Sequence, residues 1–150
     1  MPESLTTVCP QCLSAVRVPG DRLADHPRCP ACKAALLPTV PIELDAGKFA
    51  QVIARTELPV LVDFWASWCG PCLRFAPVLE RAAAAFSPRL IVAKVNTEVA
   101  QELASRLGIR SIPTLILFRG GRELARVSGA LPEAQLAEWV GGALGWTQAA

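Results

Sequence analysis

The sequence lacks a surplus of charge of either sign. Its 15 Lys and Arg residues are balanced by 13 Asp and Glu residues, which gives a formal net charge of +2. The first 38 residues carry four basic and three acidic side chains, so the remainder carries eleven and ten. Proteins that bind nucleic acid usually concentrate basic side chains on one segment or face. The balance therefore argues against a nucleic-acid partner.

Long apolar runs are also missing. No run reaches the ~18 residues that a membrane-spanning helix needs. The first ten residues, MPESLTTVCP, have neither the basic start nor the apolar stretch of a signal peptide. We therefore expect no membrane association and a cytoplasmic location. In that compartment closely spaced cysteine pairs are usually metal ligands or redox centres, since structural disulfides are rare there.

Bulky apolar side chains are scarce in the first 38 residues, although 52% of the whole chain is apolar. This segment holds four of the six cysteines. Such a segment cannot build a core of its own and needs additional stabilisation, for example by a bound metal ion. Residues 37–41, LPTVP, favour a short, stiff linker because of their two prolines. We expect a small module over residues 1–38 and a second domain over residues 39–150.

The four N-terminal cysteines have the spacing of a metal site. Cys9 and Cys12, followed by Cys29 and Cys32, form the pattern C-x2-C-x16-C-x2-C. Two tight CxxC turns present four soft sulfur ligands, which suits one tetrahedral zinc ion in a zinc ribbon. Two disulfides, or four free thiols, are the alternatives. Since four cysteines complete the ligand set, we expect His26 to lie in a solvated loop.

From residue 40 onward, strand patterns alternate with helical patterns. We expect strands over residues 40–44, 60–66, 90–96, 114–119 and 122–128, and helices over residues 46–55, 69–86 and 99–107 and from Pro132 onward. The alternation predicts an α/β fold with a mainly parallel sheet and helices on both faces. Gly120-Gly121 predicts a hairpin between the last two strands. Residues 60–66, VLVDFWA, are apolar apart from Asp63, which predicts a central strand covered on both faces.

A third CxxC follows this central strand directly. In the stretch WCGPC, Cys69 lies at the expected N-terminus of a long helix, where free N–H groups and the helix dipole favour thiolate. Cys72 lies one turn further on and is placed to resolve a mixed disulfide. A second metal site would need a further CxxC or a pair of histidines, which the sequence lacks. An inert buried pair is the other alternative, which Gly-Pro at a helix start disfavours.

Asp63 is an acidic residue within an apolar strand. A buried carboxylate is costly unless it is paired or functional. We expect Lys94, the single charge in residues 90–96, to be its companion. An ordinary ion pair that faces water at a strand end is the alternative.

The residues around the third CxxC resemble a known family. Residues 62–72, VDFWASWCGPC, resemble the active-site segment of thioredoxins, and residues 111–114, SIPT, resemble their cis-proline loop. The likeness covers about residues 40–144. The preceding ribbon makes the whole chain similar to thioredoxins of the bacterial thioredoxin 2 type. The resemblance implies the thioredoxin fold, a central mixed five-stranded sheet flanked by four helices.

The resemblance also implies a function. Thioredoxins reduce protein disulfides, bind no organic cofactor themselves, and are recycled by thioredoxin reductase at the expense of NADPH. Asp63, assisted by Lys94, would accept the proton of Cys72, and Pro113 would be cis. An apolar patch around Cys69 would bind the disulfide-containing protein substrate, formed by Trp68, Gly70, Pro71, Ile112, Pro113, Gly129 and Ala130. Trp65 would support the site from below.

Two positions depart from the family pattern. Leu73 stands where thioredoxins often have Lys, and Ser111 stands where many have Gly. Both affect the fine tuning of thiol acidity and partner choice. We expect a monomeric protein disulfide reductase. The alternatives are a zinc-ribbon adaptor with the second domain as its scaffold, and a redox-sensing ribbon whose thiolates oxidise and release zinc.

Overall fold

The computed structural model of the chain describes residues 4–146, which form a two-stranded and a five-stranded sheet. The first sheet consists of β1 (Ser4–Val8) and β2 (Ala15–Pro19), and the 3-10 helix η1 (Gly20–Asp25) follows it. The other elements are β3 (Ile42–Glu43), α1 (Ala46–Arg55), β4 (Val60–Trp65), α2 (Gly70–Phe86), β5 (Ile91–Asn96), α3 (Gln101–Arg106), β6 (Thr114–Arg119), β7 (Arg122–Ser128) and α4 (Glu133–Leu144). Within residues 4–146, every helix is too short or too polar to cross a bilayer.

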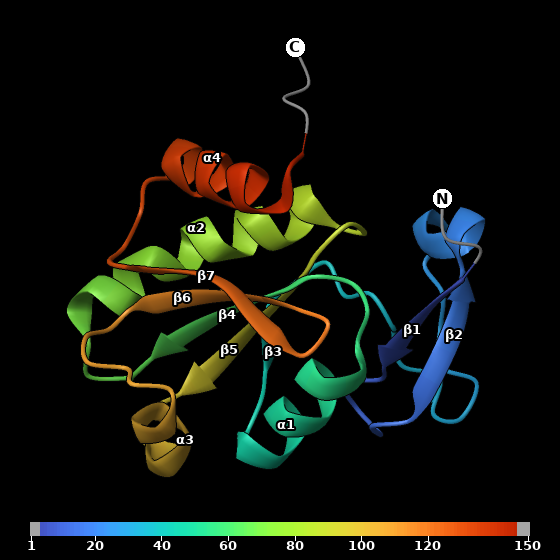
Figure 1. The fold of residues 1–150 in the computed structure, drawn as a ribbon, viewed down its shortest axis with the longest axis horizontal. Coiled ribbons are helices and arrows are strands. Elements are labelled where there is room, and N and C mark those ends of the chain that lie inside the picture. The colour runs from blue at the N-terminus through green and yellow to red at the C-terminus, as the bar shows by residue number, and fades with distance from the viewer. Residues whose placement is uncertain (1–3, 147–150) are drawn as a thin grey trace.

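The five-stranded sheet is mixed. Its strand order is β3-β5-β4-β6-β7. Strands β3, β5 and β4 are parallel to one another, β6 runs antiparallel to β4, and β7 runs antiparallel to β6. Helices α2 and α4 cover one face, and α1 and α3 cover the other (Figure 1). The central mixed five-stranded sheet flanked by four helices, which the resemblance implies, is therefore confirmed.

The central strand β4 divides the core into two layers. Its residues Val60, Val62 and Phe64 pack in one apolar cluster with α1. Leu61 belongs to a second cluster, which contains Phe75 and other apolar residues of α2 and α4. Because side chains alternate along a strand, Asp63 points to the same face as Leu61, beneath α2.

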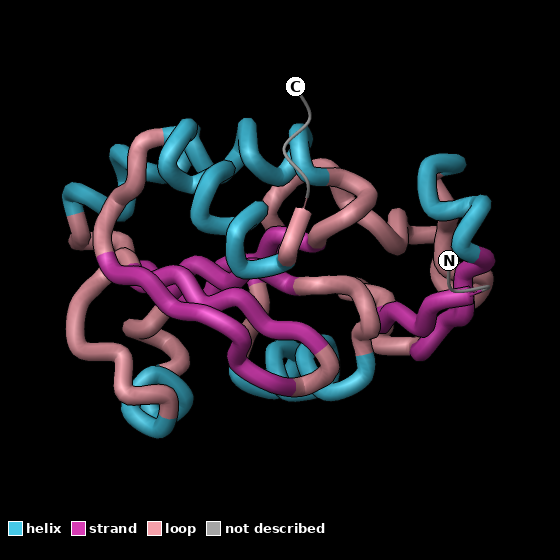
Figure 2. The backbone as a smooth tube through the Cα atoms, turned by 45° about the horizontal axis from the view of Figure 1, so that its top comes forward, coloured by secondary structure: helices cyan, strands magenta, loops and turns pink. Residues whose placement is uncertain are grey.

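The N-terminal ribbon shares the core of the larger domain. Val8, Val18 and Leu36 of the ribbon belong to the same buried cluster as Val52 and the other apolar residues of α1. The backbone is also joined, because Val8 N–H donates to Thr56 Oγ1 at 3.2 Å and Glu57 N–H donates to the carbonyl of Thr6 at 2.8 Å. Figure 2 shows the ribbon as a separate pair of strands beside the large sheet. It docks where β4 begins, at the opposite end of the sheet from the start of α2 (Figure 1).

Several boundaries differ from the sequence prediction. The strand expected over residues 40–44 is reduced to Ile42–Glu43, because Pro41 lacks the N–H that a ladder needs and Val40 is 58% exposed. The strand β1 was not predicted, since its polar sequence SLTTV shows no clear alternation. The last helix begins at Glu133, with Pro132 as its N-cap.

The hairpin between β6 and β7 is confirmed. Gly120 has φ +62° and Gly121 has φ +79°, and Arg119 pairs with Arg122 across the turn. A two-residue loop with positive φ at both positions matches the right-handed twist of the strands that it joins. The hairpin forms one edge of the sheet, and its open end, where Thr114 pairs with Ser128, adjoins the loop that carries Pro113.

Candidate functional site

The redox pair lies where β4 ends and α2 begins. Cys69 is the N-cap residue of α2, and its Sγ accepts a hydrogen bond from the backbone N–H of Cys72 at 3.2 Å. Pro71 occupies the first turn, where its missing N–H leaves no hydrogen bond unmade. The free N–H groups of a helix start stabilise negative charge. The local sequence therefore places a sulfur atom where the backbone favours a thiolate.

Cys69 and Cys72 form a disulfide, with their Cα atoms 5.2 Å apart. The two side chains are 4% and 3% exposed. The loop before β6 faces them, because the Ile112 carbonyl oxygen lies 3.7 Å from Cys69 Sγ. The Ile112–Pro113 peptide is cis, as expected.

The surface around the pair is mainly apolar and open. Trp68 is 71% exposed and lies beside Ile112 in a shallow hollow of about 180 Å³. Gly129 follows the end of β7, where its N–H donates to the Pro113 carbonyl at 2.8 Å. Its φ of +109° is a conformation that other residues rarely adopt. Exposed residues of the expected patch are Trp68, Pro71 and Ala130, and partly buried ones are Gly70, Ile112 and Gly129, whereas Pro113 is buried.

A second loop fixes the segment that leads to Cys69, and the sequence reasoning did not anticipate it. One carboxylate oxygen of Glu98 accepts hydrogen bonds from Ser67 N–H at 2.8 Å and from Ser67 Oγ at 2.6 Å. Thr97 donates through N–H and Oγ1 to the carbonyl of Trp65 at 2.8 and 3.0 Å. These bonds of Ser67 lower the pKa of Glu98. The sequence contains no motif for this contact, since its two sides lie 31 residues apart.

Asp63 is buried on the face of β4 that α2 covers. It is 1% exposed, and its Oδ1 has no hydrogen-bond partner within the described residues. Burial is the main cause that raises the pKa of this carboxyl to about 7; the ammonium of Lys94 opposes the rise, and the carboxylate of Glu43 adds to it. An unpartnered buried carboxyl that titrates near neutral pH is suited to accept and return protons.

Lys94 lies beside Asp63 as expected, but the two residues do not form a salt bridge within the described part of the chain. They are direct neighbours in the register of β4 and β5. The Nζ atom of Lys94 instead lies 4.3 Å from the centre of the Trp65 ring. In this position the positive charge of Lys94 interacts with the Trp65 ring as well as with the neighbouring carboxylates of Asp63 and Glu43.

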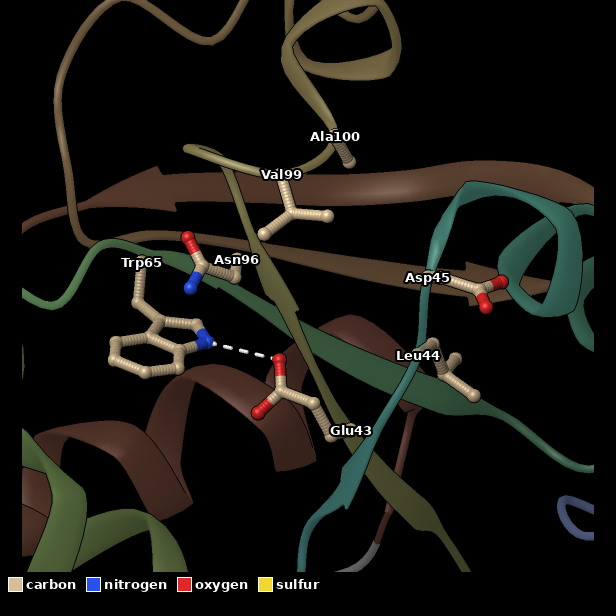
Figure 3. Close-up of a pocket in the computed structure, with 7 residues that line it drawn as sticks. All are labelled: Glu43, Leu44, Asp45, Trp65, Asn96, Val99 and Ala100. Carbon is tan, nitrogen blue, oxygen red and sulfur yellow. Dashed lines mark hydrogen bonds between the residues drawn. The ribbon is translucent and has the colours of Figure 1, made fainter.

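Trp65 supports the redox pair from the side. It is partly buried and packs against the buried cluster formed by Ala66, Cys69 and Cys72. Its Nε1–H donates to Glu43 Oε2 at 3.2 Å, and Figure 3 shows the indole ring turned toward that carboxylate. The ring borders an open hollow of about 340 Å³ between β3, β5 and the start of α3.

The four N-terminal cysteines converge at the tips of two tight turns. Cys9 Sγ lies 3.5 Å from Cys32 Sγ, Cys12 Sγ lies 3.6 Å from Cys29 Sγ, and all four sulfurs lie within 4.8 Å of one another. A tetrahedron of zinc–sulfur bonds of about 2.3 Å places its sulfurs about 3.8 Å apart. The donor set and its spacing fit one zinc ion. His26 lies outside this cluster.

The two CxxC turns have the same backbone geometry. The residue after each second cysteine, Leu13 or Lys33, has a positive φ of 66° or 70°. Its N–H returns to the carbonyl of the first cysteine of the pair, at 2.9 Å to Cys9 and at 2.8 Å to Cys29. Each turn thus aims both of its sulfurs in one direction, and an antiparallel bridge between Arg28 and Ala35 closes the second turn.

The thiols of Cys12 and Cys32 differ in acidity. Hydrogen bonds from the side chain and backbone of Ser14 lower the pKa of Cys12 to about 6. At Cys32 the backbone N–H of Ala34 lowers the pKa, but burial and the neighbouring sulfurs outweigh it and raise the value to about 12. Four adjacent thiolates repel one another, and a divalent cation at their centre would relieve that repulsion.

Two family models match the chain. Residues 40–141 match the thioredoxin family, and residues 8–34 match the zinc-ribbon family described as the N-terminal part of thioredoxin 2. The first match covers the five-stranded domain and the redox pair. The second covers all four clustered cysteines.

Individual relatives agree with the family models. The chain is 44% identical to thioredoxin C-3 of Corynebacterium nephridii over 133 residues, which are 89% of this chain and 91% of that protein. It is 50% identical to a thioredoxin of Alicyclobacillus acidocaldarius over 62% of this chain and 88% of that protein. It is 39% identical to a thioredoxin of Haemophilus influenzae over 66% of this chain and 92% of that protein. With its disulfide-bonded Cys69 and Cys72 at the active-site position, the chain belongs to the thioredoxin family of protein disulfide oxidoreductases.

Proposed function

We propose that the protein reduces protein disulfides, with Cys69 as the attacking thiol and Cys72 as the resolving thiol. The observation that carries this assignment is the position of Cys69 as N-cap of α2, with the N–H of Cys72 3.2 Å from its sulfur. A thiolate is stabilised there, and the thiolate is the nucleophile of disulfide exchange. Cys72 follows three residues later and is close enough to form the disulfide.

The reaction proceeds in two exchanges. The Cys69 thiolate attacks one sulfur of the substrate disulfide, the substrate S–S bond breaks, and the released substrate thiolate takes up a proton. The Cys72 thiol then loses its proton and attacks Cys69 Sγ, which forms the Cys69–Cys72 disulfide and releases the second substrate thiolate. Two electrons pass from the protein to the substrate, one proton comes from Cys72, and the solvent supplies the other, because Cys69 reacts as its thiolate.

We infer that Asp63 accepts the proton of Cys72 and returns it to the leaving thiolate, with Lys94 assisting. Asp63 lies on the face of β4 that α2 covers, between Leu61 and Trp65 in the alternation of side chains, and Trp65 packs against the buried cluster that contains Cys72. A carboxyl with a pKa of about 7 is about half ionised at neutral pH, so it serves both transfers. Lys94 limits the rise in this pKa by its positive charge.

Protein substrates would bind in extended form along the patch formed by Trp68, Gly70, Pro71, Ile112, Pro113, Gly129 and Ala130. The Ile112 carbonyl lies 3.7 Å from Cys69 Sγ and precedes β6, so its backbone is placed to pair with a substrate strand. A shallow apolar surface without a deep pocket suits many different substrates.

We propose that residues 1–38 form a zinc ribbon and residues 39–150 form the thioredoxin domain. The spacing of the sulfurs of Cys9, Cys12, Cys29 and Cys32 supports one bound zinc ion, which would be structural, since four protein ligands leave no open coordination position. The matched ranges, 8–34 and 40–141, support a boundary near residue 38.

Thioredoxin reductase would return the oxidised pair to its dithiol form, using NADPH, so the chain itself needs no organic cofactor. We further propose that the protein acts as a monomer in the cytoplasm. Clusters of cysteines that bind metal are typical of reducing compartments, where thiols stay reduced, and this supports the location.

The test is NADPH-coupled reduction of a model protein disulfide in the presence of thioredoxin reductase. We expect full activity of the wild type and none of Cys69→Ser. Cys72→Ser should accumulate a covalent complex with the substrate, because the first exchange proceeds and the second cannot. Ser105→Ala, which removes an exposed hydroxyl from α3, is the control and should retain turnover. Activity of Cys69→Ser comparable to wild type would refute the assignment.

A further inference from the structure

Glu43 lies on the edge strand β3, in line with two residues of the redox centre. In the register of the parallel strands, Glu43 is opposite Lys94, and Lys94 is opposite Asp63. Directly opposed residues on neighbouring strands point to the same face of a sheet. The three side chains therefore form a row beneath α2, with one cationic group between two carboxylates.

Glu43 also holds a residue of the redox centre directly. Its Oε2 accepts the Nε1–H of Trp65 at 3.2 Å (Figure 3). The same side chain packs against the buried cluster of Ala66, Cys69 and Cys72, and the centre of its ring lies 4.3 Å from Lys94 Nζ. Glu43 thus contacts an aromatic side chain that both packs against the cluster of the redox cysteines and lies under the ammonium group of Lys94.

The charged groups around Asp63 are few. Lys94 faces it from β5, Glu43 lies beyond Lys94 on β3, and Cys72 on α2 is held in the disulfide and carries no charge in the oxidised protein. On the other side β6 presents the apolar Leu115. Glu43 and Lys94 line an open hollow of about 490 Å³, together with Glu80 on the next turns of α2. Glu80 is exposed and lines the same hollow, but it belongs to a helix and is not part of the row of Glu43, Lys94 and Asp63 on the sheet.

We propose that Glu43 is a positioning residue of the redox centre, which fixes the indole of Trp65 against the cysteines and competes with Asp63 for the ammonium group of Lys94. The inference rests on the proposed role of Asp63. With Glu43 ionised, Lys94 is shared, and the charged form of Asp63 is stabilised less. Burial, Lys94 and Glu43 are the causes that set the pKa of Asp63, and the contribution of Glu43 is upward.

Two substitutions separate the two effects. Glu43→Gln removes the charge but keeps an amide oxygen that can accept the Nε1–H of Trp65. Glu43→Ala removes both the charge and the acceptor. Glu80→Gln is the matched control, because it removes an exposed carboxylate from the same hollow. The measurements, on oxidised full-length protein, are the pH titration of the Asp63 carboxyl carbon by NMR and the indole N–H resonance of Trp65.

We expect Glu43→Gln to lower the pKa of Asp63, so that its protonated fraction at pH 7 falls below the wild-type value of about one half, while the Trp65 resonance stays in place. Glu43→Ala should lower that pKa as well and also move the indole resonance. The pH profile of mixed-disulfide resolution should shift to lower pH in both. Glu80→Gln should change none of these.

An Asp63 titration in Glu43→Gln that matches Glu80→Gln would overturn the electrostatic part, and an unchanged indole resonance in Glu43→Ala would overturn the positioning part. Asp63→Asn distinguishes this inference from the proposed mechanism. If Asp63→Asn abolishes the pH profile of resolution but Glu43→Gln leaves it unshifted, the base is correct and the role of Glu43 is wrong. If Asp63→Asn leaves resolution unchanged, the proposed base itself is wrong.

Discussion

Replacement of Asp63 by asparagine should make the folded protein more stable at alkaline pH than the wild type. Burial raises the pKa of Asp63 from 3.8 to about 7. Between these two values the folded state binds more protons than the unfolded chain, so the free energy of unfolding falls as the pH rises. The stability is fully present below pH 3.8 and is lost as the pH passes the folded-state pKa.

The size of the effect follows from the two pKa values. A difference of about three between them corresponds to about 4 kcal/mol, at about 1.36 kcal/mol for each pKa unit. Asparagine has no proton to release, so the Asp63→Asn variant lacks this loss. The buried amide adds its own cost of roughly 1–3 kcal/mol if it is unpartnered, but that cost does not depend on pH. The informative quantity is therefore the change of the difference with pH.

The assay is denaturant unfolding of the oxidised, zinc-loaded protein at several values between pH 5 and pH 9. The advantage of Asp63→Asn over the wild type should grow by about 3 kcal/mol of the total of about 4 kcal/mol within this window, most steeply between pH 5 and pH 6, and should level off above pH 7, where the folded protein has also lost the proton. Glu80→Gln, which removes an exposed carboxylate, should remain parallel to the wild type. Parallel curves for Asp63→Asn and the wild type would show that the carboxyl titrates normally, and the proton-acceptor argument would lose its basis.

Four further changes test the fold and the substrate surface. Leu36→Ala in the ribbon should lower the free energy of unfolding by about 2–5 kcal/mol, because Leu36 is 1% exposed in the core shared with α1. The unfolding midpoint followed by tryptophan fluorescence should fall with it, and an unchanged midpoint would mean that the two modules unfold separately. Removal of zinc by a chelator should lower the same midpoint, since all the tryptophans lie outside the ribbon, and an unaltered melting curve would contradict this. Gly120→Ala should lower the free energy of unfolding by about 1–2 kcal/mol, because residue 120 has a φ of +62°. As its control, Gly47→Ala within α1 should raise that free energy by about 0.5–1 kcal/mol. Equal effects of the two substitutions would argue against the left-handed turn. Trp68→Ala should raise KM for a protein disulfide but leave turnover of a small aromatic disulfide and thermal stability unchanged, since the side chain is 71% exposed; a loss of stability would give it a structural role.

The larger domain was largely predictable because its local signals agree with one another. The apolar run of β4, the Gly120-Gly121 turn and the amphipathic α1 each specify one structure, and all of them occur as expected. The elements that sequence reasoning missed or lengthened depend on distant partners. Strand β1 is held by β2 and by the residues that precede β4, and β3 is limited by Pro41.

In the redox site, too, residues in short local motifs were predictable, and contacts between distant side chains were not. Cys69, Cys72 and Pro113 lie in short motifs, and the structure brings them together. Asp63 was conspicuous as an acid in an apolar strand, but its neighbour Lys94 was expected to pair with it and instead lies over Trp65. No local pattern specifies where a long flexible side chain ends when an aromatic ring competes with a carboxylate for it.

The position of the ribbon bears on what its metal does. The ribbon contacts α1 and the residues just before β4, whereas Cys69 follows the other end of that strand. The six residues of β4 span roughly 17–20 Å at about 3.3 Å each. None of the residues assigned to disulfide exchange belongs to α1 or to the connection between α1 and β4. A change in the ribbon therefore reaches the redox pair mainly through the shared core, which means through the stability of the whole domain. This favours a zinc ion that holds the domain together over one that tunes the chemistry of Cys69.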